Sequence, residues 1–145
     1  MAATQGTSGF GTLLKRGDGG VGAGVAATLT KGSTNSQIVI GWGTAGTVGN
    51  GKTVVAVASG NNTPLSVTVS TTAISITLET DGSAASVSSV NDVIAKLYAN
   101  ATFAANWTAT DGVGDGTGVL AAFTSDVLAS GTAGTEVFTT IAEIT

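Results

Sequence analysis

Residues 46–53 read GTVGNGKT and fit the pattern G-x-x-x-x-G-K-[ST] at every fixed position. In a phosphate-binding loop of this pattern, a helix follows the glycine-rich turn at once, and its free backbone N–H groups and dipole face the phosphates. Here Lys52 and Thr53 are followed by VVAVAS, a β-branched run that favours a strand. Because the helix that would carry the chemistry is missing, a glycine-rich hairpin loop is the better interpretation.

Carboxylates offer two further kinds of chemistry. Asp111 and Asp115 lie in the loop DGVGDGTG, where clustered oxygen ligands would suit Ca²⁺. The loop lacks the repeated acids and the bidentate glutamate of a calcium loop, so a plain turn is favoured. Glu79 and Asp81 are a carboxylate pair of the kind that hydrolyses glycosidic bonds, but they stand beside a predicted turn, where solvated acids are ordinary. We predict no catalytic residue, no metal site and no cofactor.

Two tryptophans are the candidates for a surface that binds a glycan or a peptide. Trp42 and Trp107 would do so together with the loop 111–118. Both also fall on predicted apolar faces or near the predicted helix, where packing in the core is the commoner outcome. The sequence leaves the two interpretations open.

The composition excludes several classes of protein. The 145 residues include neither Cys nor His, so thiolate nucleophiles, imidazole bases, disulfides and the commonest zinc sites are ruled out. Charged residues make up only 10% and the net charge is −4, which suits a protein that works in an assembly. The five basic residues are spread along the chain, so no patch is predicted to hold a nucleic acid. No apolar run is long enough for a membrane anchor, and the first residues do not resemble a secretory signal.

Alternating apolar residues predict a series of strands. Residues 65–70 and 73–79 are separated by two threonines and alternate strictly, which predicts a hairpin with one buried face. The other predicted strands lie at 37–42 and 54–59. Two further apolar runs follow at 106–111 and 118–130, and the second is expected to pair with the central hairpin.

One helix is predicted, from about Val90 to Ala101. Ser89 and Asp92 have the spacing of a capping box, and Val93 and Leu97 continue an apolar stripe at helical spacing. The fold class that follows is α+β: a strand-rich sheet with one packed amphipathic helix, a flexible N-terminal arm and a C-terminal strand. We place the arm at 1–32, the α+β module at 33–131, and a linker with the last strand at 132–145.

The two ends of the chain look like one segment split apart. GFGTLLKRGDGG (residues 9–20) and TEVFTTIAEIT (residues 135–145) together resemble the start of the major tail tube protein of long-tailed bacteriophages, where an arm leads into the first strand of a β-barrel. The region between them resembles a small α+β module of phage tail and virion proteins, in TAGTVGNGKTV, LSVTV, AISITL, the helix 90–98 and GDGTGVLAAF. The tail tube family continues beyond this strand to complete its barrel. Either the chain is a portion of a longer subunit, or its ends attach a separate decorating protein.

The resemblance implies a structural protein of the virion, not an enzyme, made in the bacterial cytoplasm and located in the phage tail. Its partners would be copies of itself in hexameric rings and other tail or virion proteins, with DNA only as passing cargo. The assembly contacts would come from the apolar residues of the ends, which are Phe10, Leu13, Leu14, Val137, Phe138, Ile141 and Ile144. The alternatives are a capsid decoration protein and a module that binds host glycans weakly.

Overall fold

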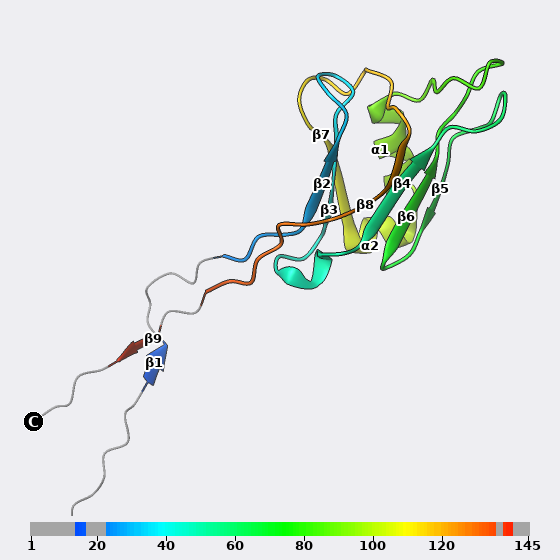
Figure 1. Cartoon of the computed structure of the whole chain (residues 1–145). Coiled ribbons are helices and arrows are strands. Elements are labelled where there is room, and N and C mark those ends of the chain that lie inside the picture. Colours follow the sequence, from blue (N-terminus) through cyan, green and yellow to red (C-terminus); the bar gives the residue numbers. More distant parts are fainter. Residues whose placement is uncertain (1–13, 17–22, 136–137, 141–145) are drawn as a thin grey trace, which may run out of the picture. The chain divides into compact units, whose positions relative to one another are not determined.

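The computed structural model describes residues 14–16, 23–135 and 138–140 (Figure 1). It divides into a larger compact unit, Ala23–Gly134, and a smaller one formed by Met1–Gly22 with Thr135–Thr145. The predicted α+β fold class is confirmed, because the described residues combine β-sheets with an amphipathic helix. No helix in the described ranges is long and apolar enough to cross a membrane.

Two sheets build the larger unit, where the sequence predicted one. A three-stranded antiparallel sheet has the order β2-β3-β7, and a four-stranded sheet has the order β5-β6-β4-β8. In the second sheet β4 and β6 run parallel, while the hairpin of β5 and β6 is antiparallel, as predicted. The strands are β2 (Thr28–Lys31), β3 (Ile38–Trp42), β4 (Thr53–Val57), β5 (Ser66–Val69), β6 (Ala73–Thr77), β7 (Trp107–Asp111) and β8 (Phe123–Val127).

The helix α1 (Val90–Tyr98) lies between the two sheets (Figure 1) and contacts the strands β7 and β5. It buries Val90, Val93 and Leu97 against the alternating apolar residues of both sheets. The predicted capping box is present: the Ser89 hydroxyl accepts a hydrogen bond from the Asp92 N–H, and the Asp92 carboxylate accepts one from the Ser89 N–H. The core therefore forms where two sheet faces and one helix face meet.

A second short helix, α2 (Ala101–Asn106), was not predicted. The first helix ends at Tyr98 because Asn100 adopts an extended conformation, and its side-chain oxygen accepts hydrogen bonds from the N–H groups of Thr102 and Phe103. Phe103 is fully buried, which anchors α2 beneath the core. The apolar residues after 100 thus belong to a separate capped turn, not to a frayed end of α1.

The boundaries of the larger unit differ from those placed by the sequence. Residues 23–31 belong to this unit and not to an arm, since Ala27 is fully buried and β2 pairs with β3 over its whole length. At the other end the unit extends to Gly134. The segment AATLTK carries few large apolar side chains, so its strand gave almost no signal.

The smaller unit contains one described pair of strands. β1 (Leu14–Arg16) and β9 (Phe138–Thr140) are antiparallel, with Leu14 opposite Thr140 and Arg16 opposite Phe138. The two ends of the chain thus meet in one two-stranded sheet.

Candidate attachment site

The larger unit begins and ends at the same place. Val25 and Thr132 exchange two backbone hydrogen bonds of 2.9 Å, and Thr28 and Ala129 exchange two more of 3.0 and 3.1 Å. The incoming segment 23–28 and the outgoing segment 129–134, which we call the neck, therefore run antiparallel as neighbours (Figure 1). A domain joined to the rest of its chain through such a pair can be carried by another domain without disturbing it.

The glycine-rich motif holds the neck. The Asn50 side chain donates a 3.0 Å hydrogen bond to the Gly131 carbonyl and accepts a 2.9 Å bond from the Gly131 N–H. The Gly46 N–H donates to the Val25 carbonyl at 3.0 Å, and the Gly51 N–H to the Leu128 carbonyl at 2.9 Å. Residues 46–51, which we call the clasp loop, thus bind both segments of the neck and satisfy their polar backbone groups.

The close approach of the clasp loop to the neck requires glycine. A Cβ atom on Gly131 would lie 2.4 Å from the Gly46 carbonyl oxygen and 3.0 Å from the Cβ atom of Ala27. A Cβ atom on Gly24 would lie 2.7 Å from the carbonyl oxygen of Thr132. The 2.4 and 2.7 Å distances are too short for any Cβ atom. Gly131 therefore permits the contact between the clasp loop and the neck, and Gly24 permits the contact between the two segments of the neck.

The motif lacks the architecture of a phosphate-binding loop. It forms a single 3₁₀ turn, η1 (Thr47–Gly49), and the next element is the strand β4. The Lys52 ammonium donates a 2.6 Å hydrogen bond to the Thr71 carbonyl and lies 3.7 Å from the centre of the Trp42 ring. The missing helix was predicted correctly, but the loop connects strands of different sheets and is not the predicted hairpin loop.

The two candidate tryptophans lie together, at the end of the unit that carries the neck. Their rings pack edge to face with centroids 5.2 Å apart. Trp107 is only 2% exposed and its indole N–H donates a 2.9 Å hydrogen bond to the Ser70 carbonyl. The suggestion of a binding surface that includes Trp107 is therefore corrected: this residue belongs to the core, and Trp42 is partly covered beside it.

The acidic candidates serve as turn and ion-pair groups. The Asp115 carboxylate accepts hydrogen bonds from the Thr117 hydroxyl at 2.8 Å and the Thr117 N–H at 3.1 Å, and these bonds lower its pKa. Asp81 accepts bonds from the hydroxyl and N–H of Ser83, which lower its pKa in the same way. Among the described residues, no three acidic side chains gather as they would around a metal ion. Asp111 ends β7 as an exposed residue.

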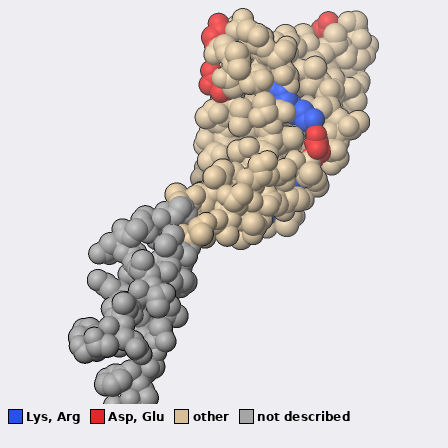
Figure 2. All heavy atoms as spheres, turned by 60° about the vertical axis from the view of Figure 1, so that its left-hand side comes forward, with Lys and Arg blue, Asp and Glu red and all other residues tan. Residues whose placement is uncertain are grey.

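One ion pair joins the two sheets between β2 and β8, the strands that adjoin the neck. Lys31 on β2 binds Asp126 on β8, and its ammonium also lies 5.6 Å from the centre of the Phe123 ring. The hydrogen bond from Lys31, supported by one from the Val127 N–H, holds the pKa of Asp126 below its ordinary value. Most of the remaining surface is uncharged, as Figure 2 shows for one face.

The residues predicted to make assembly contacts fall mostly outside the described ranges. Phe10, Leu13, Val137, Ile141 and Ile144 lie outside them, while Leu14 and Phe138 lie in the β1–β9 pair, opposite Thr140 and Arg16 respectively. The neck and the role of Asn50 were not predicted, because Asn50 and Gly131 are separated by 81 residues and Asn50 stands at a variable position of the glycine-rich motif.

Comparison of the chain with protein-family models, with curated proteins and with solved structures found no match.

Proposed function

We propose that the chain is a structural protein of a bacteriophage virion, a tail tube subunit or its N-terminal portion. In this role Ala23–Gly134 is a decoration module inserted into the domain to which both ends of the chain belong. The module projects outward from the tube, and the ends carry the assembly.

The observation that carries this proposal is the pairing of the two ends. The chain enters and leaves the module through the neck, and its first and last described strands then pair with each other. This is the arrangement expected when an independent domain interrupts a single continuous one. It agrees with the resemblance of the two ends to one split segment of a tail tube protein.

The pairing of β1 with β9 supports a role in assembly. A two-stranded sheet gains stability when strands of a neighbouring chain add to it, and such strand addition is a common mode of association. The partners that we propose are copies of the same chain in a ring and other proteins of the tail. DNA passes as cargo only, and the net charge of −4 suits a wall that does not hold it.

The proposal is tested by locating the chain in the particle. Antibody fragments raised against residues 23–134 should decorate the phage tail at regular intervals in electron micrographs, with the labels on its outer surface. Decoration of the head alone would instead establish a capsid decoration protein and contradict the tail assignment. Particles that carry no label, although the antibody binds the free chain, would contradict both.

A further inference from the structure

One edge of the larger unit offers unpaired backbone groups. The Ser70 N–H donates to the Ala73 carbonyl, so the hydrogen-bonded pairs of the β5–β6 hairpin are those with Ser66, Thr68 and Ser70 on β5. The N–H and C=O groups of Val67 and Val69 therefore point away from β6. β5 is the last strand of its sheet, and within the described part of the chain these groups make no hydrogen bond.

The other described edges of the larger unit are covered. The Tyr98 hydroxyl donates to the Ala109 carbonyl at 3.3 Å and accepts from the Ala109 N–H at 3.2 Å, which occupies the free edge of β7. The edges of β2 and β8 are joined by the bridge between Thr28 and Ala129 and by the pair of Lys31 and Asp126. Proteins commonly block sheet edges in this way, and the open edge of β5 is therefore an exception.

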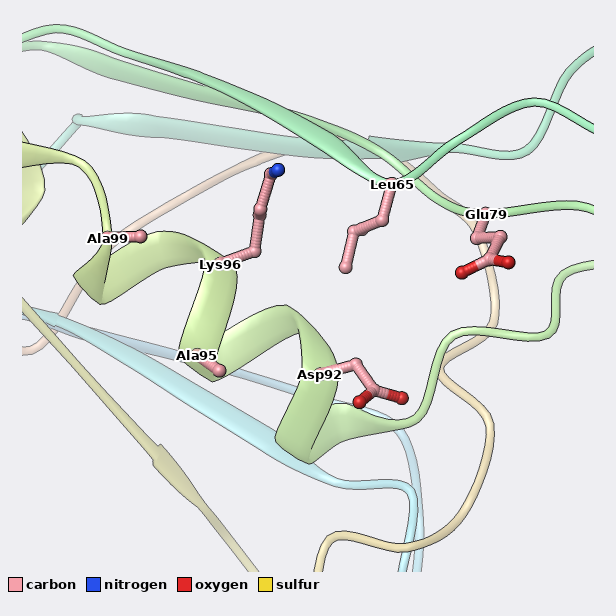
Figure 3. Close-up of a pocket in the computed structure, with 6 residues that line it drawn as sticks. All are labelled: Leu65, Glu79, Asp92, Ala95, Lys96 and Ala99. Carbon is pink, nitrogen blue, oxygen red and sulfur yellow. The ribbon is translucent and has the colours of Figure 1, made fainter.

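A groove runs beside this edge. It has a volume of about 480 Å³, and its walls are α1 and the ends of β5 and β6 (Figure 3). Leu65 points into it from the sheet and Lys96 from the helix. On the helix side it is also lined by Ala95 and Ala99, whose short side chains fill little of its volume. Glu79 lies at the end near Leu65.

The charges of the groove are separated along its length. Lys96 stands in the last turn of α1 and makes no ion pair with any described residue. At the opposite end the Glu79 carboxylate likewise has no described partner, whereas the Asp92 carboxylate is held by the N–H and hydroxyl of Ser89. The groove thus offers a cation toward the C-terminal end of α1, carboxylates toward its N-terminal end, and the apolar side chain of Leu65 between them.

We propose that the edge of β5 and this groove form a docking site for an extended peptide strand of another protein. The strand adds to the sheet through the free backbone groups of Val67 and Val69. It carries an acidic side chain at the end beside Lys96 and a basic one at the end beside Glu79, with small or β-branched side chains over Leu65, Ala95 and Ala99. The charges fix which way the strand runs, and the backbone bonds supply the affinity.

The probes are two labelled hexapeptides with blocked ends, DVTVKT and the reversed sequence TKVTVD, since the strand can run parallel or antiparallel to β5. In both peptides the acidic and the basic residue are four positions apart and so lie on the same face of an extended strand. Fluorescence anisotropy with the full chain should show that one of them binds more tightly. Amide hydrogen exchange at Val67 and Val69 should slow in the complex, because their N–H groups become bonded. No binding by either peptide up to its solubility limit would overturn the proposal.

Two variants separate this site from nonspecific binding. Lys96→Glu should weaken the preferred peptide about two- to fivefold, the range expected for an exposed ion pair, and should leave the binding of its Asn-for-Asp analogue unchanged. Val67→Pro removes an outward N–H that β6 does not use, and should abolish binding. Should that variant fold poorly, peptides N-methylated on alternate amides test the same bonds in the unaltered chain.

The proposal fails if Lys96→Glu leaves the affinity for both hexapeptides unchanged and exchange at Val67 and Val69 is not slowed. These experiments use the isolated chain and are independent of where it resides in a particle. Their failure would leave the proposed tail location intact, and the reverse also holds.

Discussion

At the scale of single residues, the glycine-rich motif shows that residues matching the pattern of a phosphate-binding loop can have a structural role instead. Its lysine is engaged with Trp42 and Thr71, and its asparagine binds the backbone of Gly131. A Cβ atom on Gly49 would lie 2.6 Å from the Cβ atom of Trp42 and 2.9 Å from that of Ala27, while Gly46 and Gly51 have positive φ angles that favour glycine. The glycines, the asparagine and the lysine of the motif thus have structural roles within the larger unit.

Replacing Asn50 tests this interpretation. Asn50→Ala removes both side-chain hydrogen bonds to Gly131 and leaves partly buried backbone groups unpaired, so the free energy of unfolding should fall by about 1–3 kcal/mol. Urea unfolding measures the loss, and amide exchange at Val25 and Thr132 should accelerate as the neck opens. The matched control is Asn61→Ala, which removes one exposed bond to Gly82 and should cost less than about 0.5 kcal/mol. Equal effects of the two substitutions would contradict the role of the clasp loop.

At the scale of elements, the sequence predicted those strands and helix ends whose residues follow a local pattern. The strands β3, β4, β5 and β6 follow from alternation and β-branched residues, and the capping box of α1 follows from the spacing of Ser89 and Asp92. β2 was missed because Leu29 is its one large apolar residue, and its place is fixed by pairing with β3. The division into two sheets, the parallel pair of β4 and β6 and the neck depend on contacts between distant segments, which no local period encodes.

The ion pair between β2 and β8 makes stability depend on pH. The pKa of Asp126 is lowered in the folded chain, so its contribution is complete above the ordinary aspartate value of 3.8 and is lost as the pH falls through the lower folded value. Unfolding midpoints measured from pH 6 downward should therefore decline below about pH 4. Asp126→Asn should reduce this decline, since the bond to the Lys31 ammonium no longer depends on a proton. An identical pH profile in the variant would show that Asp81, Asp115 or other groups account for the whole effect.

At the scale of the whole molecule, the chain consists of one larger compact unit, Ala23–Gly134, and a smaller unit that contains the paired strands β1 and β9. The core of the larger unit is made by residues of β3, β4, β6, β7, α1 and α2, together with Ala27 in the neck and Leu78, Leu120 and Leu128. Its boundaries therefore lie at 23 and 134 and include the neck, whereas the sequence placed them ten residues further in at the start.

Two fragments distinguish these boundaries. The fragment 23–134 should fold alone and unfold in a single thermal transition close to that of the full chain, because it retains every strand of both sheets. The fragment 33–131 lacks β2 and the buried Ala27, which leaves one edge of β3 and its apolar face uncovered, and should be unfolded or strongly destabilised. Calorimetry and circular dichroism measure both. A folded 33–131 fragment, or an unfolded 23–134 fragment, would contradict the description of the unit.

The adjacency of the two segments of the neck also bears on inheritance. The stretch of gene that encodes residues 23–134 specifies a unit whose first and last segments lie side by side, so recombination could exchange it for the gene of another domain with equally close ends. Under the proposed function, such an exchange would change the surface that the chain presents and keep the pair of β1 and β9.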